Sequence, residues 1–412
     1  MAYQSLEKLF HMDASNDRFG NNVTLAASRR EAESTFKTSF DISGEELFLA
    51  TPRELSLINE TILGREREIA VALADLPAIA RGALIRSLVI DEVVCSNELE
   101  GVYSTRRQIN ELLETMPVDS SRLSHRRFRE LARLYLELSD DAHVLPRTPE
   151  DIRRIYDRIM SGEDLGEDAP DGTLFRKGEV SIIGDGGRVI HQGISPESRI
   201  ISALSQMISL ASSPDIPGTY RAAASHFIFE YTHPFYDGNG RTGRYLLALY
   251  LSQSLSTLTA LSLSRIIAEN RSPYYKAFRE AEHPLNHGEL TPFVIMLLQY
   301  VDVAQQRILS DLEVRGSQFQ IVKSRLERLS KRESVPDKQR DLLFMLAQFD
   351  LFGAFPDVPI EAMEEYLGLR REMTRKHVKA LEGRGLAKKV SARPLRFALT
   401  EKGRVELGIG DV

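Results

Sequence analysis

One stretch constrains this chain more than any other part of it. The stretch runs from His233 to Arg244 and reads His-Pro-Phe-Tyr-Asp-Gly-Asn-Gly-Arg-Thr-Gly-Arg. It lies between two apolar segments with helical spacing, residues 220–231 and residues 242–252. Its glycines let the backbone turn sharply and approach an anion closely. We therefore predict a loop that leads from a core helix into a second helix, whose N-terminus favours bound phosphate.

The side chains of this stretch comprise a base, a metal ligand and two cations. His233 can take a proton near neutral pH, because the unperturbed pKa of histidine is about 6.5. Asp237 is a hard oxygen ligand for Mg²⁺, which commonly holds phosphates with one or two protein carboxylates. Arg241 and Arg244 are three residues apart, so that on a first helical turn they can address different phosphates. Together these residues predict a site for nucleotide transfer.

The same stretch resembles, position for position, the HPFx(D/E)GNGRxxR signature of the Fic family. The resemblance implies transfer of part of a nucleotide, usually AMP from ATP, to a hydroxyl of a target protein. ATP is then the expected substrate and Mg²⁺ the expected cofactor, with His233 as the catalytic base. Asp237 is expected to bind the metal at the α- and β-phosphates, and Asn239 with the flanking glycine amides to hold phosphate oxygens. The nucleotide-binding residues implied are Asp237, Gly238, Asn239, Gly240, Arg241, Thr242, Gly243 and Arg244.

An upstream segment, Ser96 to Gly101, resembles the inhibitory motif (S/T)xxxE(G/N) that many Fic proteins carry on a helix before the core. Ser96 and Glu100 are four residues apart and would share a helix face, and Gly101 suits a helix end. A Glu100 carboxylate against Arg244 would form a bidentate pair and occupy the arginine that the γ-phosphate needs. We therefore predict self-inhibition. The resemblance leaves open a second reaction, in which Glu100 orients a water that removes AMP from modified targets.

Residues 175–190 predict a β-hairpin, because a β-branched run is followed by glycines and a second apolar run. In Fic proteins a hairpin at this place aligns the target by strand addition and touches the nucleotide. We therefore expect the target protein along this flap, and Ile183 and Gly184 beside the nucleotide; a simple surface hairpin is the alternative. Further on, Tyr275 is expected to stack on the adenine, although core packing would also explain it.

The C-terminal part predicts three helices followed by two strands, and it resembles a winged helix-turn-helix. Residues 370–396 contain ten Lys or Arg against two Asp or Glu, a local charge of +8 in a chain whose net charge is -6. Such a surface could contact DNA, with the third helix in a major groove and the wing on phosphate. The residues expected to do so are Arg375, Lys376, Lys379 and Arg393. Docking of a protein, including dimerisation, is the alternative and remains open.

Composition limits the class of protein. The net charge of -6 predicts no general affinity for nucleic acid or anionic membrane. Cys95 is the only cysteine, so no intramolecular disulfide can form. Neither a signal peptide nor a membrane span is expected, which favours the cytoplasm. A homodimer is compatible with the sequence.

These patterns predict a mostly α fold: a Fic-type helical core with a small β-hairpin flap, followed by a winged helix-turn-helix domain. The leading function is a self-inhibited protein adenylyltransferase acting on Tyr, Thr or Ser hydroxyls of a target and of itself. The alternatives are a DNA-binding regulator with a nucleotide-sensing core, and a Fic enzyme that transfers another nucleotide. The predicted divisions are a polar arm at 1–40, a helical segment at 41–121, the core at 122–310, a connecting helix at 311–338 and the C-terminal domain at 339–412.

Overall fold

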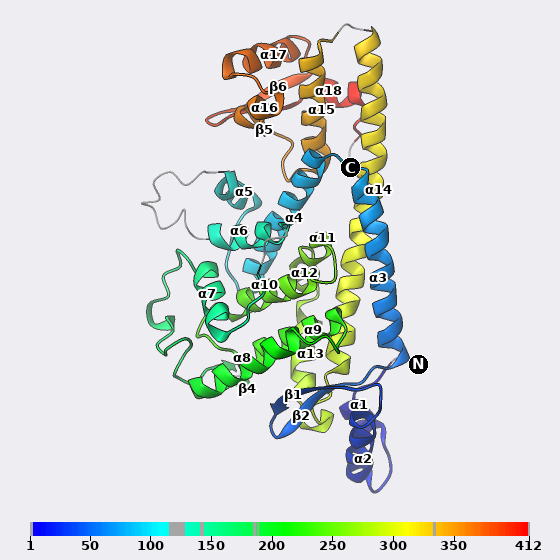
Figure 1. Ribbon diagram of the computed structural model, residues 1–412, viewed down its shortest axis with the longest axis vertical. Helices are drawn as coiled ribbons and strands as arrows, with labels where there is room; N and C mark the ends of the chain where they lie inside the picture. Colours follow the sequence, from blue (N-terminus) through cyan, green and yellow to red (C-terminus); the bar gives the residue numbers. More distant parts are fainter. Residues whose placement is uncertain are drawn as a thin grey trace. The chain divides into compact units, whose positions relative to one another are not determined.

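A computed structural model gives the fold and describes residues 3–114, 128–140, 144–183, 187, 189–332 and 335–410. Within these residues the chain is mostly helical, with small antiparallel sheets, as the sequence predicts (Figure 1). The chain divides into two compact units. The first comprises Met1–Glu66 and Asp91–Gln305, and the second comprises Arg67–Ile90 and Gln306–Val412. None of the described helices is both long and apolar enough to cross a lipid bilayer.

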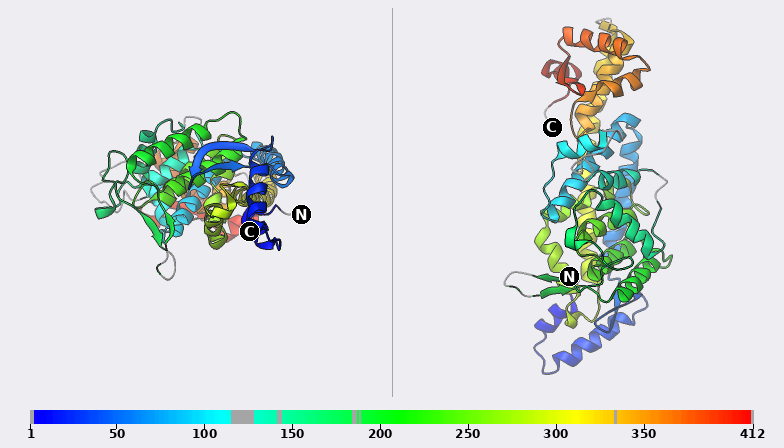
Figure 2. Two further views of the ribbon diagram at one scale, coloured as in Figure 1. Left: turned by 90° about the horizontal axis from the view of Figure 1, so that it is seen from below. Right: turned by 90° about the vertical axis from the view of Figure 1, so that its left-hand side faces the viewer.

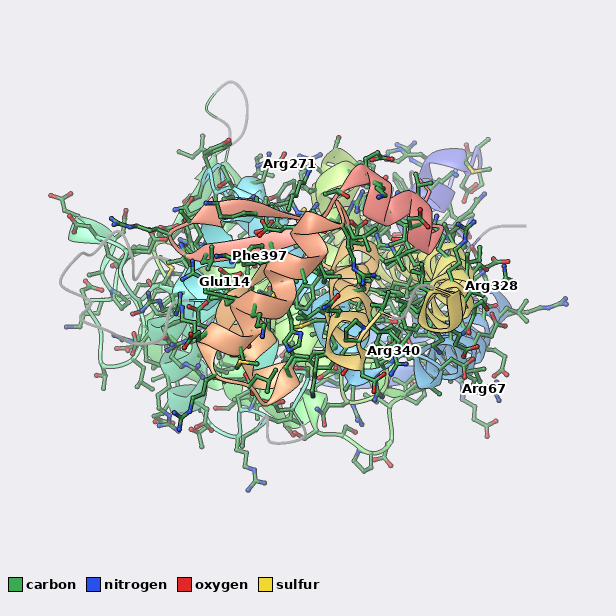
Figure 3. The ribbon with its side chains drawn as sticks, turned by 90° about the horizontal axis from the view of Figure 1, so that it is seen from above. Arg67, Glu114, Arg271, Arg328, Arg340 and Phe397 are labelled. Carbon is green, nitrogen blue, oxygen red and sulfur yellow. The ribbon has the colours of Figure 1, made fainter. Side chains whose placement is uncertain are left out.

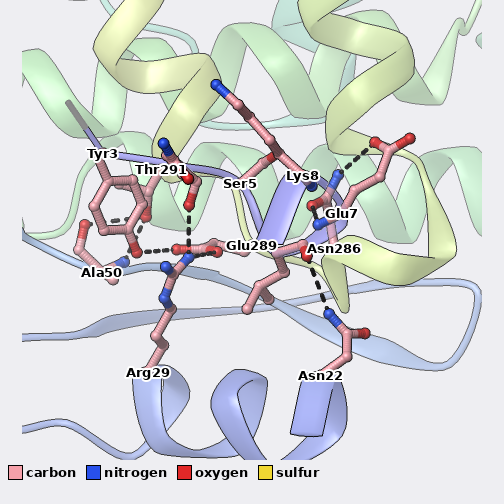
Figure 4. Close-up of polar contacts among 12 residues, drawn as sticks. Tyr3, Ser5, Glu7, Lys8, Asn22, Arg29, Ala50, Asn286, Glu289 and Thr291 are labelled. Atoms are coloured by element: carbon pink, nitrogen blue, oxygen red, sulfur yellow. Dashed lines mark hydrogen bonds and ion pairs between the residues drawn. The ribbon is translucent and has the colours of Figure 1, made fainter. Parts of the chain in front are cut away.

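The N-terminus of the first unit is folded, where the sequence predicts a polar arm. It forms α1 (Leu6–Met12), α2 (Arg18–Arg30) and a hairpin of β1 (Phe36–Ile42) and β2 (Glu45–Leu49). The Ser5 side chain caps α1 and that of Asp17 caps α2. The polar side chains that make this segment look unstructured instead pair with residues much later in the chain (Figure 4). Buried Glu289 accepts hydrogen bonds from Tyr3 and Arg29, for example.

The remaining helices of the first unit surround a buried pair, α9 (Gly218–Thr232) and α10 (Asn239–Leu251), which pack on each other. Most side chains of both helices are buried, which is why these segments are apolar on all sides rather than along one stripe. The surrounding elements are α5 (Arg106–Glu114), α6 (Arg129–Glu137), α7 (Pro149–Ile159), η2 (Gly166–Asp168), α8 (Glu197–Ala211), α11 (Thr257–Ala260), α12 (Leu263–Glu269), α13 (Arg271–Ala281) and η4 (Pro284–Asn286).

The predicted hairpin is present in the first unit. Strand β3 (Ser181–Ile183) pairs antiparallel with β4 (Val189–Gln192), and Figure 2 shows the hairpin projecting from the neighbouring helices. Gly184, predicted to lie beside the nucleotide, falls outside the described residues.

The points at which the chain passes from one unit to the other fall inside three long helices: α3 (Arg53–Ala74), α4 (Ala78–Leu99) and α14 (Thr291–Arg332). The connecting helix predicted at 311–338 is the second half of α14, which continues without interruption from residue 291. The predicted division at residue 310 therefore falls inside a helix, because nothing in the local sequence breaks it.

The second unit carries the predicted order of three helices and two strands. These are α15 (Asp337–Phe352), α16 (Ile360–Leu367), α17 (Arg371–Gly383), β6 (Ala387–Ala392) and β7 (Leu395–Leu399). A short β5 (Val358–Pro359) and α18 (Glu401–Leu407) are additional, and the sheet order is β5-β7-β6. Phe397 of β7, labelled in Figure 3, belongs to the core of this unit.

Candidate active site

The loop between α9 and α10 reverses the chain through two left-handed residues. His233 caps α9 with a φ of 49°, and Gly238 precedes α10 with a φ of 81°. The positive φ of Gly238 would strain any residue with a side chain, and a Cβ there would also lie 2.5 Å from the sulfur of Met160, so this turn favours glycine. The sharp reversal places His233 and the N-terminus of α10 on the same cleft.

Asn239 holds this loop in shape with its side chain. Its Oδ1 accepts from the N–H of Phe235 at 2.9 Å, and its Nδ2 donates to the carbonyl of Phe235 at 2.8 Å. Both polar groups of the buried amide are thus used within the loop. The backbone of Asn239, rather than its side chain, is therefore available to bind a phosphate.

Arg176 fixes the start of the loop, a role that sequence reasoning missed. Its fully buried guanidinium donates to four carbonyls, those of His233 at 2.8 Å, Gly178 at 2.6 Å, Ile194 at 2.8 Å and Thr232 at 3.4 Å. These contacts join the base of the flap to His233. The one signal in the sequence is an arginine directly after Phe175, at the beginning of the predicted hairpin.

His233 is held as a neutral imidazole. Burial, with smaller contributions from nearby His191 and Arg176, lowers the pKa of His233 to about 4. The ring centroids of His191 and His233 are 6.2 Å apart. Nδ1 of His233 is buried and has no hydrogen-bond partner among the described residues. At neutral pH His233 can therefore accept a proton, which is what a general base needs.

A cleft of about 510 Å³ opens beside His233. Residues of the predicted site that line it are Glu100, His233, Asp237, Gly238, Asn239, Gly240, Arg244 and Tyr275. Four of the predicted nucleotide-binding residues do not line it, namely Arg241, Thr242, Gly243 and Ile183, and neither do Ser96 and Gly101 of the predicted inhibitory segment. From the flap, Ile182 and Ile190 line the cleft instead, while Ile183 is 64% exposed.

Arg244 is engaged by the predicted inhibitory segment. Its Nη2 donates to Glu100 Oε1 at 2.8 Å and to the Ser96 carbonyl at 2.9 Å, while its Nε donates to Ser96 Oγ at 3.0 Å. Glu100 is thus bound through one nitrogen, where the sequence predicts a bidentate pair, and Ser96 accepts from Nε and also from Nη2. Burial raises the pKa of Glu100, but Arg244, Arg241 and His233 together lower it by more, so the net shift is downward.

Gly101 and Gly240 allow this contact. Gly101, with a φ of 71°, ends the turn after α4 and leaves Glu100 directed at α10. A Cβ on Gly240 would lie 2.1 Å from the Glu100 carboxylate. The carboxylate therefore lies directly on the helix N-terminus to which phosphates were predicted to bind.

Glu230, which the sequence analysis did not select, also lines the cleft. Burial raises the pKa of Glu230 to about 8, and its Oε1 has no partner among the described residues. A Cβ on Gly243 would lie 2.0 Å from this oxygen. Gly243 therefore permits close packing of α9 on α10 rather than contact with a ligand.

Arg241 is buried and does not line the cleft. Its side chain is 1% exposed, and its Nη1 donates to Glu163 Oε1 at 2.7 Å. Asp237 is half exposed and accepts a hydrogen bond from the N–H of Gly238 at 2.6 Å. No group of three or more His, Cys, Asp or Glu among the described residues could hold a metal ion. Asp237 alone still fits Mg²⁺, which takes one or two carboxylates when phosphates supply further ligands.

Tyr275 lies at the cleft with 39% of its surface exposed. It packs edge-on against Tyr274 at a centroid distance of 5.2 Å, and the Tyr274 hydroxyl lies 2.7 Å from Nε2 of buried His226. The ring of Tyr275 is thus supported from behind and open on the cleft side, as stacking on a base requires.

The basic residues of the second unit divide into two groups. Arg396 is buried against Asp357, and Arg371 pairs with Glu361 at 3.0 Å. By contrast, an exposed group on α17 and at the β6–β7 turn consists of Arg375, Lys376, Lys379 and Arg393. Part of the local positive charge is thus neutralised internally, and the remainder faces solvent.

Comparison with known proteins identifies the region that contains this site. Residues 146–251 match the Fic/DOC family, so the chain carries a Fic domain. The chain is 33% identical over 114 residues to protein adenylyltransferase fic-1 of Caenorhabditis elegans, covering 28% of this chain and 20% of that protein. It is 27% identical over 236 residues to protein adenylyltransferase Fic of Drosophila grimshawi, covering 56% of this chain and 45% of that protein.

The aligned part of the chain thus spans less than half the length of these curated relatives. Among solved structures, a Fic family protein from Desulfovibrio desulfuricans aligns with a TM-score of 0.49 at 20% identity, covering 83% of this chain and 97% of that one.

Proposed function

We propose that this protein is an adenylyltransferase that moves AMP from ATP to a Tyr, Thr or Ser hydroxyl of a target protein. The observation that carries the proposal is His233, a neutral imidazole that lines a cleft bordered by the N-terminus of α10. A general base beside a helix N-terminus is suited to activating a hydroxyl against a phosphate. The names of the relatives agree with this activity.

In the reaction, the triphosphate lies at the N-terminus of α10, where free N–H groups and Arg244 face the cleft. His233 takes the proton of the target hydroxyl, and the oxygen of that hydroxyl attacks the α-phosphorus. The bond between the α-phosphorus and the bridging oxygen breaks, and pyrophosphate leaves with the electron pair. Asp237 would hold Mg²⁺, which neutralises phosphate charge when bound. The remaining contribution is positioning, which is the main requirement of such a displacement.

Self-inhibition is part of the proposal. Glu100 and Ser96 use donors of Arg244 that a γ-phosphate would need, and the Glu100 carboxylate lies against Gly240. A phosphate at this position would meet a negative charge instead of a free arginine. The protein is therefore expected to be nearly inactive until Glu100 moves.

The flap is the proposed docking site for the target. Ile182, Ile183 and Val189 are exposed on strands that pair only with each other among the described residues. Free strand edges bind an extended peptide through the main chain, and exposed apolar side chains add contacts. The target hydroxyl would then be delivered beside His233.

The test is incorporation of label from ATP labelled at the α-phosphate, with Mg²⁺, into the protein and into cell-lysate proteins. Glu100→Gly should raise incorporation over the wild type, and Glu100→Gly/His233→Ala should abolish it. Incorporation of label that persists in Glu100→Gly/His233→Ala would refute the role of His233 as the general base. Incorporation from labelled UTP but not ATP would assign another nucleotide to the same site.

A second function is favoured by one observation, the exposed basic group on α17 and the β6–β7 turn. We propose that this surface binds duplex DNA as a winged helix-turn-helix does, with α17 in the major groove. The test is the salt dependence of duplex binding by the full chain. An affinity that falls steeply with salt supports it, and no binding at physiological salt refutes it.

A further inference from the structure

Arg241 lies between two carboxylates, and its contacts with them differ. Its Nη1 donates to Glu163 Oε1 at 2.7 Å, whereas its Nη2 lies 3.6 Å from Asp237 Oδ2. The first is a short hydrogen-bonded ion pair, and the second lies beyond hydrogen-bond distance. The side chain of Glu163 is 11% exposed and that of Asp237 is 50% exposed.

A guanidinium as buried as that of Arg241 requires an anionic partner, because an unpaired buried charge is strongly destabilising. Glu163 meets this requirement from the turn that follows α7. Asp237 is then left with the N–H of Gly238 as its close contact and with half of its surface facing outward. Of these three side chains, only that of Asp237 lines the cleft.

Asp237 is also the obvious alternative partner. It is four residues before Arg241, and closing the gap of 3.6 Å to hydrogen-bond distance requires a movement of less than about 1 Å. If Glu163 were uncharged, Arg241 would satisfy its charge with Asp237. A carboxylate paired with arginine is a poorer metal ligand, because its lone pairs and charge are already used.

We propose that Glu163 is a positioning residue that keeps Arg241 away from Asp237 and so leaves the Asp237 carboxylate free for a divalent cation that arrives with the nucleotide. This inference rests on the proposed function, in which Asp237 holds the metal. In this proposal Arg241 acts on the site through Asp237 and not by contact with a ligand, which agrees with its absence from the residues that line the cleft. It also explains why a motif arginine is buried against an acidic residue outside the motif.

The experiment measures the affinity of Mn²⁺ by water-proton relaxation, with an ATP analogue that has a methylene between the α- and β-phosphates. The full chain with Glu100→Gly is the parent, so that Arg244 is free. Adding Glu163→Gln should weaken Mn²⁺ binding about tenfold, the usual size of an effect from a residue behind a metal ligand. Adding Arg241→Gln as well should restore the affinity to near that of the parent, because the residue that captures Asp237 is gone.

Three controls make the result specific. Glu167→Gln, at an exposed position of η2, should leave Mn²⁺ affinity unchanged. Glu163→Asp retains the charge and should lie nearer to the parent than Glu163→Gln. Circular dichroism melting identifies any variant that does not fold. If Glu163→Gln does not fold, Glu163→Asp is compared with the parent in its place.

Unchanged Mn²⁺ affinity in Glu163→Gln would overturn the proposal. The proposal would also be overturned if Glu163→Gln/Arg241→Gln bound Mn²⁺ more weakly than Glu163→Gln alone, because the effects of purely structural damage add up. Absence of nucleotide-dependent Mn²⁺ binding in the parent would also overturn it, since Asp237 would then hold no metal. If the expected pattern appears but no AMP is transferred, the proposed function fails and the role of Glu163 stands.

Discussion

The N-terminus of α10 and the outer face of α17 both carry positive charge, but in opposite environments. On α10 the side chains of Arg241 and Arg244 are 1% and 2% exposed, and each is paired with a carboxylate. On α17 Arg375, Lys376 and Lys379 are exposed. A buried cation acts through one partner and one geometry, whereas an exposed basic face acts through its summed charge. The same residue types should therefore respond very differently to substitution.

The largest contrast is expected for removal of one cation from each region. Arg244→Met should lower the free energy of unfolding by about 3–5 kcal/mol, because the Glu100 carboxylate loses its buried counter-charge. Arg375→Met is the matched substitution on α17 and should change it by about 0.5 kcal/mol or less. Urea unfolding followed by circular dichroism measures both. Equal costs would remove the distinction between the two regions.

The buried region should also make stability depend on pH. The pKa of His233 is lowered to about 4 from an unfolded value of about 6.5. Between these values the unfolded chain binds a proton that the folded chain does not, so stability falls as the pH falls through this window. His233 should contribute about 2 kcal/mol to that loss. His233→Gln should flatten the unfolding free energy between pH 6.5 and about 4, and an unchanged slope would contradict a buried neutral imidazole.

Two glycines with the same backbone role sharpen the comparison further. Gly101 follows α4 with a φ of 71°, and Gly368 follows α16 with a φ of 63°, both with open space where a Cβ would be. Alanine at either position should cost about 1 kcal/mol of stability from backbone strain alone. Gly101→Ala should in addition raise AMP transfer, because it disturbs the turn that holds Glu100 on Arg244. Equal transfer by the two variants would show that this turn does not hold the inhibitory contact.

The smallest effect on stability is expected on α17. Lys376→Gln/Lys379→Gln should change the free energy of unfolding by no more than about 0.5 kcal/mol, because both side chains are exposed. Duplex DNA binding should nevertheless weaken, and the slope of log affinity against log salt should fall by about two, one for each lost phosphate contact. An unaltered slope would mean that these lysines do not contact phosphate.

Much of the fold follows from local sequence patterns. The mostly helical class, a hairpin that begins within 175–190 and extends to Gln192, and the helix and strand order of the C-terminal part are present. Periodicity and turn residues act over a few positions, so they can be read without the tertiary structure. The polar arm is the clearest failure, because Tyr3 and Arg29 find their partner in Glu289, far along the chain.

The features of the candidate site likewise divide into those that local sequence patterns predict and those that depend on contacts between distant residues. The sequence by itself determined the motif from His233 to Arg244, because residue types at fixed spacing carry that information, whereas the pairing of Arg244 with Glu100 was expected only from the resemblance to the Fic family. Only the tertiary structure decided that Arg241 pairs with Glu163, that Asn239 is used inside the loop and that Arg176 holds His233. These facts depend on which distant groups lie within about 3 Å, and on the need of every buried charge and amide for a partner. Spacing along a chain can state which groups are available, but packing determines which of them meet.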